Sequence, residues 1–149
     1  MNLDHPIEMI LKEKGSKVYS VSPQATVFEA LVIMADKRVG ALVVMDGDRL
    51  VGMFSERDYA RKVVLAGRSS REMKVHELMS SKVLTVGPQT TVDECMQHMT
   101  DKRCRHLPVV DGGKLVSIVS IGDLVNWVIK IQDLTIHELE DYISGQYPR

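Results

Sequence analysis

Residues 18–29 read VYSVSPQATVFE, and residues 83–94 read VLTVGPQTTVDE. The similarity continues without a gap to Val63 and Val128, at a constant offset of 65 residues (from Val18 to Val83). The later matches are MxDKR at 34–38 and 99–103, Asp-Gly at 46–47 and 111–112, and Ser-x-x-Asp at 55–58 and 120–123. An internal repeat of this kind predicts two similar units, which can pack about a pseudo-two-fold axis. Clefts between such units come in matched pairs, which favours ligand binding.

The size of the chain suggests that the two repeats depend on each other. The chain has 149 residues, and each repeat alone is roughly 60 residues long, a size at which a separate hydrophobic core is marginal. Hydrophobic residues make up 44% of the sequence and the mean hydropathy is −0.06, values typical of a globular protein. Apolar runs reach about five residues, far short of a membrane span, so no membrane partner is predicted.

Charge and composition exclude other classes of partner. The net charge of −1 and the scarcity of aromatic residues (one Trp, four Tyr and two Phe) argue against a nucleic-acid surface. The two cysteines, Cys95 and Cys104, are too few for a disulfide scaffold and are interpreted as buried thiols in a reducing compartment. The N-terminal residues lack the basic and apolar regions of a signal peptide. We therefore expect a cytoplasmic protein.

Turn residues and hydrophobic periodicity predict the order β-α-β-β-α, used twice. The predicted strands are Lys17–Val21, Ala41–Met45, Arg49–Phe54, Val83–Val86, His106–Val110 and Lys114–Val119. The predicted helices are Ile7–Lys14, one beginning at Thr26, Ser55 to about Leu65, Val75–Met79, one beginning at Thr91, Ser120 to about Ile131, and one from Thr135 to near Ser144-Gly145. Predicted boundaries are 1–16 for an N-terminal helix, 17–66 for the first repeat, 67–80 for a linker with a short helix, 81–131 for the second repeat, and 132–149 for a C-terminal helix.

The repeated motifs resemble those of cystathionine-β-synthase (CBS) domains, which occur in tandem as the Bateman module. The family signature, a small residue followed by two apolar residues and Ser/Thr-x-x-Asp, matches GMFSERD at 52–58 and SIVSIGD at 117–123. VHELMS at 75–80 is similar to the usual approach to a repeat, and RHLPVVD at 105–111 to the usual second strand. The resemblance implies a stand-alone α/β protein of two CBS repeats about a pseudo-two-fold axis.

The resemblance also implies a ligand and a set of residues that bind it. Bateman modules bind AMP, ADP, ATP or NAD, and less often S-adenosylmethionine, in two clefts between the repeats. One cleft would combine Ser55 and Asp58 with Arg105 and His106, and the other would combine Ser120 and Asp123 with Gly40 and Ala41. The signature Asp takes the ribose hydroxyls. The remaining candidate contacts are Arg57, Arg61, Tyr19, Leu107 and Pro108.

The chemistry of these residues suits a nucleotide, but it also has a simpler explanation. One ionised carboxylate can accept both hydroxyls of a ribose, and the start of a helix favours a nearby phosphate. However, Ser-x-x-Asp is also a helix cap, and on spacing alone capping is the commoner role. Thr26-x-x-Glu29 shows that the chain uses such caps elsewhere. The family resemblance and the duplication favour ligand binding for Asp58 and Asp123.

The basic residues near these motifs leave alternatives open. Arg57 and Arg61 could contact phosphate or could be solvated cations, and His106 could contact phosphate or pack in the fold. A phosphate role is favoured for Arg105, because a charged residue at the entrance to an apolar strand needs a reason. Since small residues, Gly40 and Ala41, stand at the other entrance, the two clefts are expected to differ. A zinc site from Cys95, His98, Cys104 and His106 fits no standard spacing and is not favoured.

We expect a nucleotide sensor that signals to an unknown effector protein and has no catalysis of its own. Neither a P-loop nor a GxGxxG motif is present. The alternatives are a structural adaptor with empty clefts and, more remotely, an enzyme that consumes a bound nucleotide. Surplus apolar residues on equivalent helices predict a symmetric homodimer, unless these residues cover the terminal helices of the same chain. They are Phe28, Val32, Ile33, Leu124, Trp127 and Ile129.

Overall fold

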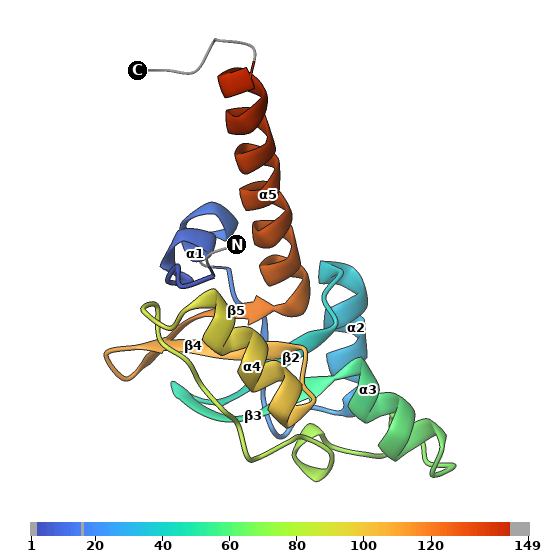
Figure 1. The fold of residues 1–149 in the computed structure, drawn as a ribbon. Helices are drawn as coiled ribbons and strands as arrows, with labels where there is room; N and C mark the ends of the chain where they lie inside the picture. Colours follow the sequence, from blue (N-terminus) through green and yellow to red (C-terminus); the bar gives the residue numbers. More distant parts are fainter. Residues whose placement is uncertain (1–2, 16, 144–149) are drawn as a thin grey trace. The chain divides into compact units, whose positions relative to one another are not determined.

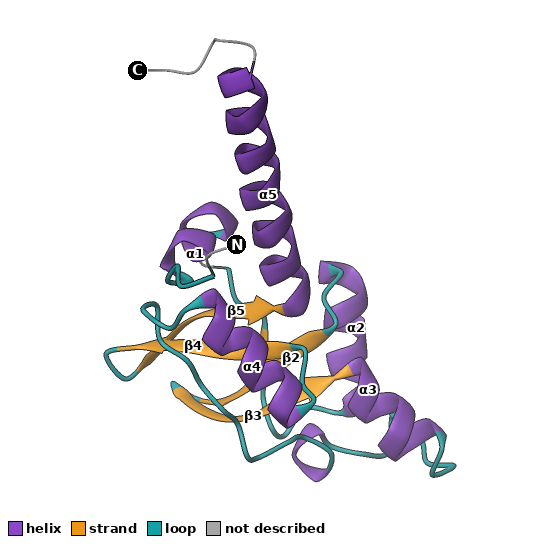
Figure 2. Ribbon diagram, in the orientation of Figure 1, coloured by secondary structure: helices purple, strands orange, loops and turns teal. Residues whose placement is uncertain are grey.

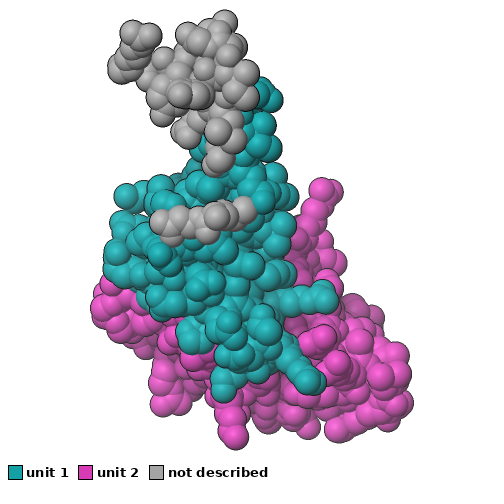
Figure 3. Space-filling view, in the orientation of Figure 1, with its two compact units in different colours: residues 1–15, 87–107, 119–149 teal, residues 16–86, 108–118 magenta. Residues whose placement is uncertain are grey.

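The computed structural model describes residues 3–15 and 17–143 and shows a mixed α/β fold (Figure 1). The described residues divide into two compact units, with residues 3–15, 87–107 and 119–143 in unit 1 and residues 17–86 and 108–118 in unit 2 (Figure 3). None of the described helices is long and apolar enough to cross a membrane. The boundaries predicted from the repeat itself stay a prediction.

Unit 2 is built around a three-stranded sheet in the order β1-β2-β3. Its strands are β1 (Ser20–Val21), β2 (Ala41–Asp46) and β3 (Arg49–Ser55). β1 pairs parallel with β2, and β2 pairs antiparallel with β3 across the tight turn at Gly47. The φ angle of Gly47 is 64°, a left-handed conformation that glycine adopts without steric cost. Figure 2 shows β2 and β3 side by side, with the following helix leading directly out of β3.

The helices of unit 2 follow the predicted order with two changes of form. They are α2 (Val27–Lys37), α3 (Glu56–Tyr59), the π-helix η1 (Ala60–Val64) and the 3-10 helix η2 (Val75–Glu77). The single helix predicted from Ser55 to Leu65 is therefore wrong beyond Tyr59, where hydrogen bonds of the i→i−5 type, such as Leu65 N–H to the carbonyl oxygen of Ala60 at 3.2 Å, widen the helix. The core of this unit gathers buried side chains from β2, β3, α2 and η2: Leu42, Val44, Phe54, Val27, Ala30, Met34 and Val75.

In the described part of unit 1 there are three helices, α1 (Glu8–Lys14), α4 (Val92–Lys102) and α5 (Ile121–Ile143). α1 lies beside the N-terminal turns of α5 (Figure 1). The sequence predicts a break in α5 between Ile131 and Thr135, but the helix is continuous there. Because residues 131–135 contain neither glycine nor proline, the helix has no reason to end, and the capping pattern beginning at Thr135 is overridden. The predicted end near Ser144-Gly145 lies outside the described residues.

The remaining strands are β4 (His106–Asp111) and β5 (Lys114–Ser120), which pair with each other. The predicted strand Val83–Val86 is wrong, since these described residues form only a single parallel bridge between Val86 and Val109. The predicted strand Lys17–Val21 is likewise reduced to β1, Ser20–Val21, and Pro108 explains why the second repeat pairs even less than the first. In the first repeat, the N–H of Val43 donates to the carbonyl oxygen of Tyr19 at 3.4 Å, but Pro108, which stands at the position of Val43, has no N–H to donate.

Each repeat helix begins against a segment that precedes a repeat in the sequence. In unit 2, the N–H of Val27 donates to Met73 and the N–H of Val75 donates to Ala25. In unit 1, the N–H of Val92 donates to His5 and the N–H of Ile7 donates to Thr90. The segment before the second repeat thus docks on the first repeat, and the N-terminal segment docks on the second. We refer to these segments as the docking segments 3–8 and 70–76.

Candidate ligand-binding site

Ser55 and Asp58 form a closed hydrogen-bonded pair at the start of α3. The backbone N–H and the hydroxyl of Ser55 each donate to Oδ2 of Asp58 at 3.0 Å, and the N–H of Asp58 donates to Oγ of Ser55 at 3.3 Å. This is a reciprocal capping box, as the spacing predicts. The Asp58 carboxylate is thereby fixed in one orientation and is half-buried.

A lysine completes the surroundings of Asp58. Nζ of Lys62 lies 3.4 Å from Oδ1 of Asp58, and it also donates to the carbonyl oxygen of Leu78 at 2.9 Å. Lys62 follows Asp58 by four residues, so this cation is local to the same helical segment. Both oxygens of the Asp58 carboxylate therefore have a partner within unit 2.

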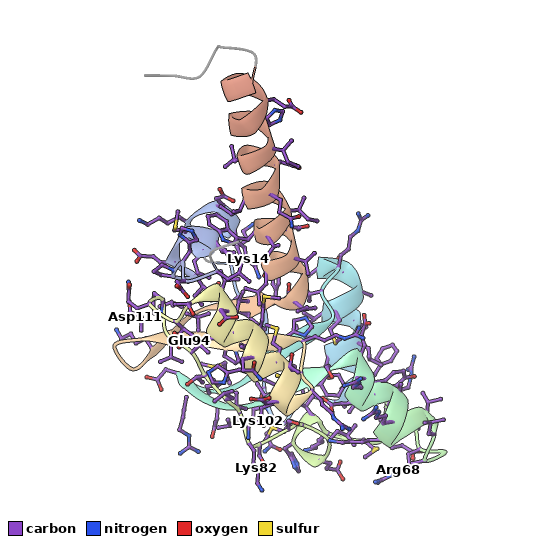
Figure 4. All side chains as sticks on the ribbon, in the orientation of Figure 1. Lys14, Arg68, Lys82, Glu94, Lys102 and Asp111 are labelled. Carbon is purple, nitrogen blue, oxygen red and sulfur yellow. The ribbon has the colours of Figure 1, made fainter. Side chains whose placement is uncertain are left out.

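Asp123 repeats the capping geometry at the start of α5 but receives its cation from a different helix. The N–H of Ser120 donates to Oδ2 of Asp123 at 2.8 Å, and the N–H of Asp123 donates to Oγ of Ser120 at 3.1 Å. Nζ of Lys14, at the C-terminal end of α1, donates to the same Oδ2 at 2.6 Å. Lys14 extends from α1 toward the N-terminal turns of α5 (Figure 4).

These contacts set the protonation of Asp123. Burial alone would raise the pKa of its carboxyl group, but the hydrogen bonds from Lys14 and Ser120, together with the charge of Lys14, outweigh burial and leave the pKa below its ordinary value. Asp123 is therefore an ionised acceptor at neutral pH, the state required to bind hydroxyl donors.

The different source of the two cations has a cause in the sequence. At the offset of 65 residues, the position of Lys62 is occupied in the second repeat by Trp127. Trp127 is 8% exposed and lies edge-on to His5 in unit 1, with ring centroids 6.0 Å apart. Since Trp127 cannot neutralise Asp123, the charge comes from Lys14 instead.

The structure brings the entrance of each second strand next to the helix start of its own repeat. The N–H of Glu56 donates to the carbonyl oxygen of Gly40 at 3.0 Å, and the N–H of Ile121 donates to that of Arg105 at 2.9 Å. The backbone at these entrances is thus held beside the Ser-x-x-Asp turn. The predicted pairing of Arg105 and His106 with Asp58, across the repeats, stays a prediction.

The other candidate residues differ in exposure. Ala41, Leu107 and Pro108 are buried, His106 and Tyr19 are half-buried, and Arg57, Arg61 and Arg105 are exposed. Tyr19 has a partner within unit 2, because Nζ of Lys37 lies 5.6 Å from the centroid of its ring. The buried residues can contact a ligand only through their backbone or through a small part of their surface.

The cysteines lie where a reactive role is disfavoured. Cys95 is fully buried, and burial together with the charge of Glu94 raises the pKa of its thiol to about 11. Burial also raises the pKa of Cys104, which is half-buried. The prediction of a buried thiol is confirmed for Cys95. Among the described residues, no group of three or more His, Cys, Asp or Glu side chains is placed to hold a metal ion.

Sequence reasoning missed two features near the site. Lys14 lies outside the repeated segment, so comparison of the repeats could not identify it. Arg38 and Arg103, which end α2 and α4, have φ angles of 56° and 52°. This left-handed conformation is uncommon for arginine at a helix end, where glycine is usual. Its only signal in the sequence was the recurrence of the same residue at both helix ends.

Comparison with known proteins places these features in a family. The family model of the CBS domain matches twice, at residues 14–65 and 75–130. The chain is 38% identical over 150 residues to the mitochondrial CBS domain-containing protein CBSX3 of Arabidopsis thaliana, covering 95% of this chain and 73% of that protein.

Solved structures of CBS-domain proteins have a similar fold. A protein from Burkholderia ambifaria described as a signal-transduction protein with CBS domains matches with a TM-score of 0.81 and 50% identity, covering 84% of this chain and 94% of that one. The hexameric CBS-CP12 protein of bloom-forming cyanobacteria matches with a TM-score of 0.75 and 25% identity, covering 96% of this chain and 83% of that one. Such proteins are regulatory or signal-transduction modules. Two matched segments in one chain, with the predicted α/β fold, show that this protein belongs to the CBS-domain family as a tandem pair of CBS repeats.

Proposed function

We propose that the protein is a regulatory module that binds adenosine nucleotides, such as AMP, ADP, ATP or NAD, and passes their level to an effector protein. The observation that supports this most directly is the pair of ionisable carboxylates, Asp58 and Asp123, each fixed by its own serine at the start of a helix. A preoriented carboxylate can accept both hydroxyls of a ribose without a further ordering cost.

The finer details of this function are also proposals. Ser55, Ser120 and the exposed cation Arg105 would contact the ribose and phosphates. A homodimer and a cytoplasmic location follow from the sequence and stay predictions. No catalysis is proposed for the module itself, in keeping with a regulatory family.

A second candidate is a structural adaptor whose carboxylates only cap helices. It is favoured by one specific observation, which is that the carboxylates of Asp58 and Asp123 already accept hydrogen bonds from serine and contact a lysine. In that case no nucleotide would need them.

Substitution of the two carboxylates separates these functions. Asp58→Ala and Asp123→Ala should each weaken one nucleotide site about ten- to a hundredfold, because a hydrogen bond to a charged acceptor contributes about 1.5–3 kcal/mol. Isothermal titration calorimetry with AMP, ATP, NAD and S-adenosylmethionine measures the loss. If the affinity of every ligand that binds the wild type is unchanged in both variants, the carboxylates are caps only.

The chain offers matched controls for this experiment. Glu29 and Glu94 occupy the same third position of the capped helices α2 and α4, outside the signature. Glu29→Ala and Glu94→Ala remove an acidic side chain from the first turn of a capped helix, as the Asp variants do, and should leave nucleotide affinity unchanged. Arg105→Ala should weaken AMP binding at one site only, and more at low salt, because an exposed charge is screened by ions. An equal loss at both sites would contradict the proposed difference between them.

A further inference from the structure

The ion pair between Lys14 and Asp123 joins parts of the chain that are 109 residues apart. Their side chains are 28% and 22% exposed, so the pair is better shielded from water than a surface ion pair. The donors from Ser120 and Lys14 both lie on Oδ2 of Asp123, at 2.8 Å and 2.6 Å. The ammonium group therefore occupies the carboxylate oxygen that the capping turn holds in place.

This ion pair fixes the C-terminal end of α1. The start of the helix is held by two buried side chains, those of Ile7, which precedes α1, and Ile10. The helix ends at Gly15, and the second ion pair near its end, from Lys130 to Glu13, has both side chains more than half exposed. An exposed pair of this kind adds little, so Lys14 is the main polar attachment of this end of α1 to α5.

The ammonium group and a ribose would compete for the same acceptor. A ribose that bonds to both oxygens of Asp123 would bring one hydroxyl to Oδ2, whose two acceptor positions are already used by Ser120 and Lys14. We propose that Lys14 is an internal competitor at the ribose site of the second repeat, which a ribose must displace, so that ligand binding at Asp123 frees the end of α1. This inference rests on the proposed nucleotide-binding function and adds a mechanism of signal output to it.

The first repeat lacks this connection. There the cation is Lys62, four residues from Asp58 in the same helical segment. Displacing Lys62 disturbs its own helical segment and a hydrogen bond to the nearby Leu78, 16 residues away, whereas displacing Lys14 frees a helix 109 residues from Asp123. Of the two sites, the one at Asp123 is therefore the one that transmits occupancy to α1.

Removal of the competitor provides the first test. Lys14→Met keeps the length of the side chain and removes its charge and donors. Adenosine is the probe, because it carries the ribose without a phosphate that could attract the lysine. Calorimetry should show adenosine binding about five- to tenfold tighter at one site, within the usual range for coupled binding. The matched control is Lys12→Met on the same helix, since the exposed ammonium of Lys12 lies 3.5 Å from Glu8 and pairs within α1. The adenosine affinity of this variant should equal that of the wild type.

Amide hydrogen exchange in the wild-type chain provides the second test. Adenosine should speed exchange of the amides in residues 11–15, and Asp123→Asn should abolish this effect. Unchanged or slower exchange with bound adenosine, or equal or weaker adenosine binding by Lys14→Met, would overturn the inference.

The two tests keep the inference separate from the proposed function. If adenosine binds in a way that depends on Asp123 but Lys14→Met does not tighten it, only the competition fails. If neither the wild type nor Lys14→Met binds adenosine or AMP, the proposed function and the competition both fail.

Discussion

Gly52 and Ser117 occupy equivalent positions in the two signatures but have different surroundings. A Cβ atom at Gly52 would lie 2.6 Å from Sδ of Met79 and 2.9 Å from the backbone oxygen of Ser80, because residues 79–80 bridge to β3 beside it. Ser117 is 2% exposed and has a side chain in the same place. The family pattern of a small residue here is thus a strict requirement for glycine in the first repeat only.

Gly52→Ala should therefore lower the free energy of unfolding by about 1–3 kcal/mol, because backbone has to move to admit the methyl group. Gly122→Ala is the matched control, since the nearest atom to its Cβ, Oγ of Ser120, is 3.6 Å away. In a helix, alanine is favoured over glycine, so this control should be neutral or slightly stabilising. Urea unfolding of both variants measures the difference. Equal stability of the two variants would contradict the crowding at Gly52.

At the scale of single residues, the sequence predicted the helix caps, because they depend only on the spacing of neighbouring residues. The caps at Thr26, Ser55, Thr91 and Ser120 follow from a side chain and a backbone N–H three residues apart, and all four are present. The partner of Asp123 could not be predicted, because Lys14 reaches it through the packing of α1 on α5. A contact between residues so far apart depends on the fold rather than on any local pattern.

Among the elements, α5 shows how one helix can replace the two that a pattern predicts. It has 23 residues, and the sequence at 131–135 supplies a capping residue but no helix breaker. Pro108 shows the opposite case, where one residue reduces the two-residue pairing seen in the first repeat to a single bridge in the second. The sequence shows both the absence of a helix breaker at 131–135 and the proline at 108. The effect of Pro108, however, depends on which backbone carbonyl would accept a hydrogen bond from an N–H at that position.

The continuity of α5 can be tested with Asp133→Pro. Proline in a helix interior costs about 3 kcal/mol, so the turns beyond residue 133 should unwind and the circular dichroism signal at 222 nm should weaken. Asp133→Ala, which favours the helix, should leave the signal unchanged or slightly stronger. If both variants gave the wild-type spectrum, the helix would end before residue 133.

At the scale of the molecule, exposed apolar side chains bear on assembly. Leu124 and Trp127 are buried, so the explanation that they cover other parts of the same chain holds for them. Val32 and Ile129 remain about half exposed, and Phe28 is 38% exposed with Arg71 over its ring at 4.2 Å. Fewer exposed apolar side chains than the sequence suggested are therefore available for a homodimer interface. Those that remain lie on α2 and on the outer face of α5.

Val32→Glu and Ile129→Glu test the homodimer, because a carboxylate buried at an apolar interface is strongly unfavourable. If these faces pair, analytical ultracentrifugation should show a shift of the wild-type dimer toward monomer in at least one variant. Val64→Glu, on η1, is the control with similar exposure, and it should leave the mass unchanged. A wild type that sediments as a monomer would contradict the prediction.

The docking segments 3–8 and 70–76 also set an order for folding during synthesis. Residues 70–76 emerge from the ribosome soon after α2, so they can close on the first repeat while the chain is still growing. Residues 3–8 dock on Thr90 and Val92, so after their own synthesis they wait for about 85 further residues, several seconds at 5–20 residues per second. The apolar residues of segment 3–8, Ile7 among them, therefore stay without their native partners for longer than those of segment 70–76.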